Sequence, residues 1–153
     1  MSQLDHFIFT PSVWEGKGKI RFNLSPEKLS FFTKWEIVQN NDKSISCIQT
    51  IDILDVPDKM ENSFHFTNIH NKKFLVSLSN EILGNVKGTG LFDKEIIAWE
   101  FKGNDLDFEG FEVFEKQENN HYLTKAEFTS KDQVRTFIEG SIWLTQNSDT
   151  LQS

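Results

Sequence analysis

The amino-acid sequence predicts an all-β protein, folded as a single antiparallel up-and-down β-barrel of about ten strands. Three observations support this fold class. Apolar and polar residues alternate with a period of two through most of the chain, as in strands that pack on one face. Short polar turns separate these segments. No segment shows the apolar 3.6-residue spacing, sustained over about ten residues, that a crossover helix requires.

The alternation is clearest in residues 13–24. Even positions there are aromatic, aliphatic or glycine, whereas most odd positions are charged. Further strand candidates follow at residues 29–39, 44–54, 62–69, 72–79, 82–87, 91–102, 106–116, 120–130 and 133–145. The breaks are rich in Asn, Asp, Gly and Pro, which form tight turns. Neighbouring strands are therefore expected to join as hairpins in an antiparallel meander.

The number of strands favours closure of this meander. An open sheet of about ten strands exposes two edges that invite aggregation, and closure into a barrel removes them. A sandwich of two sheets is the alternative architecture. No linker-like segment interrupts the chain, so we expect one barrel domain over residues 1–153. The polar residues 146–153 are expected to form a loose tail.

Composition and charge narrow the function classes. The chain has 153 residues, with 16 basic residues against 23 acidic ones and a formal charge of −7, which argues against a nucleic-acid partner. A single cysteine, Cys47, excludes an internal disulfide. The four histidines show no metal-ligand spacing. No apolar run approaches the roughly 20 residues of a membrane span, and the start of the chain lacks signal-peptide features. We therefore expect a cytoplasmic protein without metal or cofactor.

Two segments near the chain ends indicate how the barrel closes. Trp14, Gly16 and Gly18 share one face of the first strand, and glycines inside a strand mark close backbone approach or a bend. The first and last strands pair in a closed barrel, so Arg135 is expected near Trp14, with its guanidinium over the indole. These four residues are predicted to close the barrel structurally. A bent strand with a core tryptophan is the simpler interpretation.

The early Trp-x-Gly-x-Gly of residues 14–18, together with the late Arg135, Phe137 and Gly140, resembles the calycin-type barrels. These include the lipocalins, the fatty-acid-binding proteins and the nitrobindin-like proteins. The resemblance implies an interior that holds a small apolar ligand. The chain departs from the lipocalins at Ser12, where they carry a glycine. It also lacks the histidine after the last strand through which nitrobindin-like proteins hold haem, so haem binding is not expected.

A small-molecule-binding barrel for a mostly apolar ligand is the function that the sequence favours. Its aromatic lining is predicted to include Trp35, Phe66, Trp99 and Phe137. His65 stands between two phenylalanines and is a candidate contact for the polar end of the ligand. An outward-facing surface histidine is the alternative for His65.

A barrel-type isomerase, cyclase or lyase is the second hypothesis. Such an enzyme needs an inward-facing ionisable group with a strongly shifted pKa, and the candidates are His65, Glu100 and Glu139. The spacing of the carboxylates singles out no catalytic pair, so the sequence favours a binding protein over an enzyme.

A filled-core interaction domain is the third hypothesis, because 15 Phe and 4 Trp could pack the barrel solid. An inward Arg135 would place Ile138, Ile142 and Leu144 outside, where a homodimer contact would have to cover them. A bulge at Gly140 would instead switch the two faces of the strand.

Overall fold

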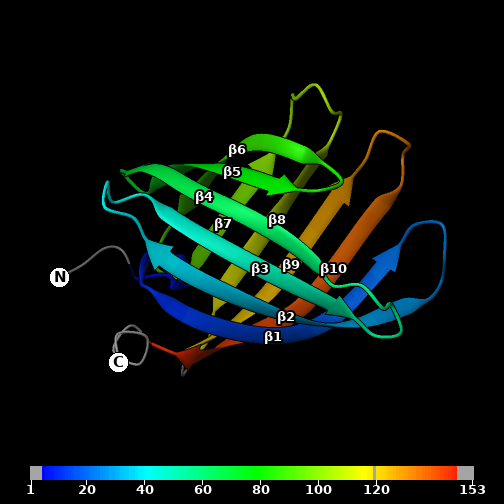
Figure 1. The fold of residues 1–153 in the computed structure, drawn as a ribbon, viewed down its shortest axis with the longest axis horizontal. Coiled ribbons are helices and arrows are strands. Elements are labelled where there is room, and N and C mark those ends of the chain that lie inside the picture. Colours follow the sequence, from blue (N-terminus) through cyan, green and yellow to red (C-terminus); the bar gives the residue numbers. More distant parts are fainter. Residues whose placement is uncertain (1–4, 119, 148–153) are drawn as a thin grey trace.

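The structure is a computed structural model that describes residues 5–118 and 120–147. Ten antiparallel strands, each paired with its neighbours in sequence, close into one barrel when the first pairs with the last, which confirms the predicted fold class (Figure 1). The strands are β1 (Ser12–Phe22), β2 (Lys28–Gln39), β3 (Ile45–Ile53), β4 (Met60–His70), β5 (Lys73–Asn80), β6 (Gly84–Phe92), β7 (Ile96–Phe101), β8 (Glu109–Lys116), β9 (His121–Thr129) and β10 (Arg135–Gln146).

The one helix in the described part of the chain is the three-residue 3₁₀ turn η1 (Phe7–Phe9). No helix in residues 5–118 and 120–147 therefore has the length and apolar character needed to cross a membrane.

The boundary between β6 and β7 differs from the sequence prediction. The pattern of the glycine-rich residues 84–90 suits a bent strand or a turn, and they lie within β6. The turn comes later, because the Asp93 carboxylate accepts hydrogen bonds from the backbone N–H groups of Glu95 and Ile96, at 2.9 and 2.8 Å. Gly90 faces inward, and a Cβ there would overlap the ring of Phe74. Glycine thus lets that ring lie directly on the β6 backbone.

The pairing of β1 with β10 closes the barrel, with Gly18 opposite Gly140 and Trp14 opposite Leu144. The two backbones approach closely on the inner side, because a Cβ at Gly16 would overlap the carbonyl oxygen of Ser141. The register runs without a shift through Gly140, so no bulge switches the faces of β10 there.

A layer of aromatic side chains fills the half of the interior nearest η1. The Trp35 ring stacks on Phe64 with centroids 5.1 Å apart, and Trp99 packs against Phe114 at 5.0 Å. The cluster also holds buried side chains from every strand, including Ile37, Cys47, Phe66, Phe74, Val76, Phe92, Ile97, Tyr122 and Ile142. These side chains supply the apolar burial that stabilises the barrel.

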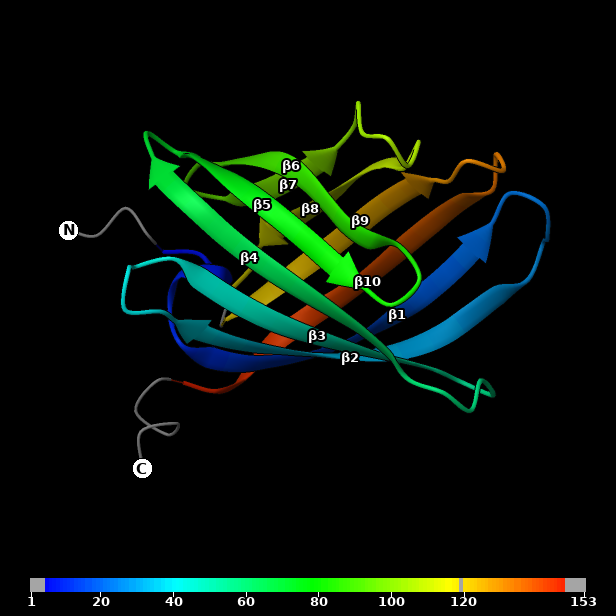
Figure 2. The ribbon, with the colours of Figure 1, turned by 45° about the horizontal axis from the view of Figure 1, so that its top comes forward.

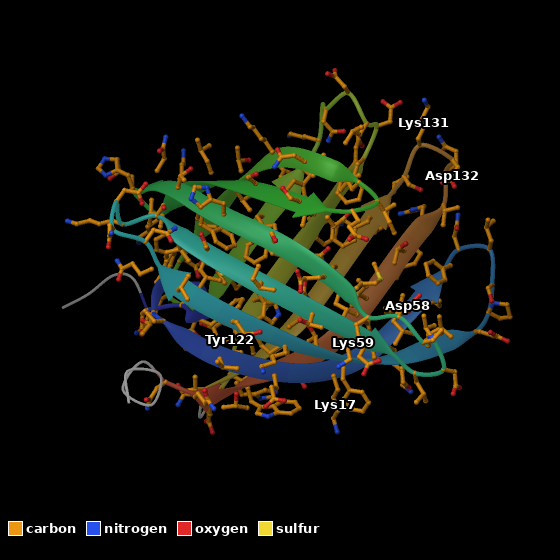
Figure 3. All side chains as sticks on the ribbon, in the orientation of Figure 1. Lys17, Asp58, Lys59, Tyr122, Lys131 and Asp132 are labelled. Carbon is orange, nitrogen blue, oxygen red and sulfur yellow. The ribbon has the colours of Figure 1, made fainter. Side chains whose placement is uncertain are left out.

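η1 plugs the end of the barrel beside this aromatic layer. Its Phe7 ring packs against Trp35 and Phe114, with centroid distances of 5.5 and 4.9 Å. The hydroxyl of the buried Tyr122, a residue labelled in Figure 3, accepts a hydrogen bond from the Phe7 N–H at 3.2 Å and lies 2.9 Å from His6 Nδ1. The plug is thus bound by both apolar packing and hydrogen bonds.

His6 anchors the plug as a neutral imidazole. Its Nε2 lies 2.6 Å from the carbonyl oxygen of Asp93, which can only accept a hydrogen bond. Nε2 therefore carries a proton, and in the uncharged ring Nδ1 accepts from the Tyr122 hydroxyl. Burial lowers the pKa of His6, in agreement with this uncharged form.

Candidate functional site

The half of the interior away from η1 carries both polar and aromatic side chains, the aromatic ones including Phe31, Phe101 and Phe128. We call it the polar half after its inward-facing polar residues, which are Thr33, Gln49, Asn62, Asn80, Glu112 and Thr124. Each shares its strand face with buried core residues; Thr33, for example, lies two residues from Trp35 and Glu112 two residues from Phe114. The loops that join β1 to β2, β3 to β4 and β9 to β10 gather at this end (Figures 1 and 2).

Three amides and a hydroxyl form one hydrogen-bonded chain across β5, β4, β3 and β2. The Asn80 amide donates to Asn62 Oδ1 at 3.0 Å, and Asn62 donates to Gln49 Oε1 at 3.1 Å. Gln49 then donates to the Thr33 hydroxyl at 3.2 Å, which donates to a backbone carbonyl of β3 at 3.0 Å. All donors point the same way, so the chain satisfies these groups without placing a charge inside the barrel.

Glu112 on β8 is the acidic group of the polar half. The residue is 9% exposed, and its Oε2 accepts a hydrogen bond from Trp99 Nε1 at 2.7 Å. Burial raises the pKa of Glu112 to about 7, although the hydrogen bond from the indole opposes the rise. Both protonation states of this carboxyl are therefore populated near neutral pH.

The sequence does not single out Glu112. Both faces of its strand are partly apolar, with Gly110 and Phe114 on one and Phe111 and Val113 on the other. The alternation in β8 therefore leaves the inner face undecided, and Glu112 is one of many carboxylates in this stretch. Only the pairing of Glu112 opposite Trp99 and Ala126 places it inside.

Solvent reaches inward-facing residues in and around the polar half but not in the aromatic layer. Trp35, Phe66 and Trp99 are at most 2% exposed. Further from η1, partly exposed inward-facing side chains come from strands on different sides of the barrel, namely Ile51, Ile53, Thr124, Phe128, Thr136 and Ile138. The accessible part of the interior is therefore the end opposite the plug.

The structure brings three of the five predicted ligand residues together. Trp35, Phe66 and Trp99 all face inward, and the Trp99 ring lies 6.3 Å from Trp35 and 5.2 Å from Phe66 between centroids. They belong to the aromatic layer beneath the polar half, where Trp99 contacts both of the others.

His65 and Phe137 lie on the outer surface, contrary to the expected inward positions. Phe64 and Phe66 take the inner face of β4, so the exposed His65 points outward, with Nε2 3.1 Å from the Ser44 hydroxyl. On β10 the inner face belongs to Ile142 and its even-numbered neighbours. Phe137 accordingly lies outside, beneath the guanidinium of Arg21 at 4.2 Å.

Arg135 does not contact Trp14, so the expected guanidinium–indole contact is wrong. Trp14 pairs with Leu144, nine residues along β10, which is about 30 Å at the rise of a strand. Arg135 is exposed at the other end, where it forms an ion pair with Glu127. The Trp14 indole instead donates to the Ser12 hydroxyl at 3.1 Å and lies beneath the plug.

The candidates for enzymatic acid–base chemistry other than Glu112 lie outside the barrel. Glu100 and Glu139 are both exposed, as is His65. Glu100 forms an ion pair with Lys102 on the outer surface. Cys47 is buried, and burial raises the pKa of its thiol. Within residues 5–118 and 120–147, no three His, Cys, Asp or Glu side chains gather as metal ligands.

An apolar groove of about 700 Å³ lies on the outer wall over β5 to β8. Leu91, Ala98 and Val113 are successive cross-strand neighbours in it, and Leu91 is 58% exposed. Thr89 and Glu100 also line it. One apolar patch of the outer surface is therefore on these strands, whereas Ile138, Ile142 and Leu144 of β10 face inward.

Comparison with known proteins gives a distant likeness in fold. No family model matches the chain, and no curated protein matches its sequence. Among solved structures, a protein from Nitrosomonas europaea described as "putative AttH" superposes with a TM-score of 0.40 at 10% identity. The match covers 94% of this chain and 53% of that protein, so the chain spans about half its length. No functional argument follows from a likeness at this level.

Proposed function

We propose that this protein binds a small, mostly apolar molecule through the end of the barrel opposite η1. The observation that carries the proposal is the contrast between the two ends. One end is filled by the plug and the aromatic layer, whereas at the other end several inward-facing apolar side chains, among them Ile51, Phe128 and Ile138, are reached by solvent. Solvent-reached apolar groups inside a concave fold are where a ligand gains most from burial.

The chemistry of this end suits an apolar ligand with one polar group. Ile51 on β3 faces the interior from one side, and Phe128 and Ile138 face it from β9 and β10. The polar half adds a few hydrogen-bonding groups. A mostly apolar lining with a few polar groups is the usual composition of a small-molecule site. Trp35, Phe66 and Trp99 would form the floor against which the ligand packs. The resemblance to calycin-type barrels supports the same interpretation.

The expected affinity is modest for a small probe. Burying about 200 Å² of apolar ligand surface is worth about 5 kcal/mol. That corresponds to a dissociation constant of about 0.2 mM. We therefore expect a two-ring aromatic alcohol, 1-naphthalenemethanol, to bind with saturation and a stoichiometry of one, as measured by calorimetry and by tryptophan fluorescence.

A matched pair of variants locates the site. Thr124→Phe places a bulky ring in the polar half and is expected to weaken binding at least about tenfold. Thr89→Phe makes the same change on the outer wall, in the apolar groove, and should leave binding within about twofold. If Thr124→Phe unfolds, Ile138→Phe nearer the rim replaces it.

Two outcomes contradict the proposal. The first is the absence of saturable binding of 1-naphthalenemethanol up to its solubility limit. The second is loss of binding in Thr89→Phe with binding retained in Thr124→Phe, which would place the ligand in the outer groove.

A further inference from the structure

Glu112 is the one acidic side chain that faces the interior from the strands of the described chain. The other members of the polar half are amides and hydroxyls, which carry no charge. The interior at this end is therefore neutral apart from a single carboxyl.

One oxygen of the Glu112 carboxyl accepts a hydrogen bond and the other accepts none from the described part of the protein. Oε2 accepts from Trp99 Nε1, and no hydrogen bond to Oε1 is found among the described residues. No buried side-chain oxygen or nitrogen in the described residues lacks a partner, so Oε1 is reached by solvent. Glu112 thus offers an acceptor toward the same interior that the proposed ligand enters.

The charge of an ionised Glu112 is not balanced within the barrel. The inward faces of β7 and β9, which flank it, carry one titratable group, the phenol of Tyr122. Burial raises the pKa of that phenol, and its hydroxyl is engaged by the plug. Across the interior, β3 contributes only the buried thiol of Cys47. No Lys, Arg or His faces Glu112 from these strands, so a buried carboxylate there has one neutral donor and no counter-charge.

We propose that the ligand is an amphiphile whose polar end is a protonated primary amine, bound by the Glu112 carboxylate. This inference rests on the proposed function and names the chemical class of its ligand. The ammonium supplies both the charge and the hydrogen-bond donor that Oε1 lacks, and its apolar body packs against the side chains nearer the rim. A carboxylic acid of the same shape would meet a like charge, and an alcohol would supply a donor without a charge.

Binding of such a ligand is coupled to a proton. Near neutral pH part of the protein carries a protonated Glu112, and an ammonium favours the ionised form. The Glu112 proton is therefore released to solvent as the ammonium binds, while the amine keeps its own proton. At about pH 7 the release should be a measurable fraction of a proton per ligand.

Three probes with one ring system test the polar end: 1-naphthylmethylamine, 1-naphthalenemethanol and 1-naphthoic acid. At about pH 8 and physiological ionic strength, we expect the amine to bind at least about tenfold more tightly than the alcohol, and the acid most weakly. Glu112→Gln should bring the amine to within about twofold of the alcohol, and it should weaken the amine much more than the alcohol. Glu109→Gln, an exposed carboxylate on the same strand, is the matched control and should change neither.

Calorimetry at about pH 7 in two buffers of different ionisation enthalpy measures the number of protons released when a probe binds. We expect release with the amine, none with the alcohol, and none with either probe in Glu112→Gln. Folding of each variant is checked by its urea unfolding midpoint.

The outcomes separate the two proposals. If the alcohol binds in the polar half but the amine is no tighter, or the acid is tighter, the ligand class inferred here is wrong and the binding function stands. An amine preference that survives Glu112→Gln would assign it to the acidic outer surface and overturn the role of Glu112. If none of the three probes binds, the proposed function itself fails.

Discussion

Replacing Glu112 with glutamine should stabilise the protein above neutral pH and leave its stability almost unchanged in acid. The pKa of Glu112 rises from 4.5 to about 7 on folding because the carboxyl is buried. Between these values the folded state binds more protons than the unfolded state, so the free energy of unfolding falls as the pH rises. The full cost of ionising Glu112 in the folded protein is about 3 kcal/mol. A glutamine side chain at this position carries no charge and avoids this cost, while its oxygen can still accept from Trp99.

The difference between the two proteins isolates this carboxyl, because other titrating groups cancel. Urea unfolding followed by tryptophan fluorescence should show a stability advantage of Glu112→Gln of about 1 kcal/mol near pH 5.5 and about 3 kcal/mol near pH 8. Glu109→Gln should show no such trend. A difference that is independent of pH, or that favours the wild-type protein in alkali, would refute the buried and uncompensated state of Glu112.

Three further predictions concern the core, the plug and the cysteine. Phe66→Ala should lower the free energy of unfolding by about 3–5 kcal/mol, and Phe137→Ala by less than about 1 kcal/mol, in urea titrations; similar losses would contradict their inner and outer positions. Tyr122→Phe removes the partner of the buried His6 ring and should cost about 1–3 kcal/mol, with faster amide exchange in residues 6–9; unchanged exchange would count against the anchoring role. Cys47 should react with a thiol reagent only after unfolding, and rapid labelling of the native protein would contradict its burial.

The barrel could be predicted because the alternation of apolar and polar residues indicates which side of a strand faces the core. In residues 13–24 every second side chain is apolar or glycine and the others are mostly charged, so the alternation fixes both the strand and its inner side. The turn after β6 could not be placed as well. Glycines in residues 84–90 are typical of a turn, yet they serve the packing of Phe74, and the Asp93 carboxylate makes the turn.

The site was harder to predict because it depends on the inner face of strands that are apolar on both sides. In β10, residues on both faces are aromatic or aliphatic, so Phe137 and Ile138 are equally plausible lining residues from sequence. Only the register with β1 shows that Ile138 faces the interior and Phe137 faces outward. The same register places Arg135 far from Trp14. Glu112 illustrates a further limit, since its raised pKa results from neighbours on other strands.

The pairing of β1 with β10 also has a consequence for how the chain folds. Every other strand pair joins neighbours in sequence and can form as a local hairpin, whereas this pair joins opposite ends of the described chain. The entropy cost of bringing these ends together is offset by contacts only after the intervening strands have paired. We therefore expect β1 and β10 to pair last. Until then two unpaired edges and the aromatic interior are open to other chains. Refolding yield should accordingly fall as protein concentration rises, even though the finished barrel has no free edge.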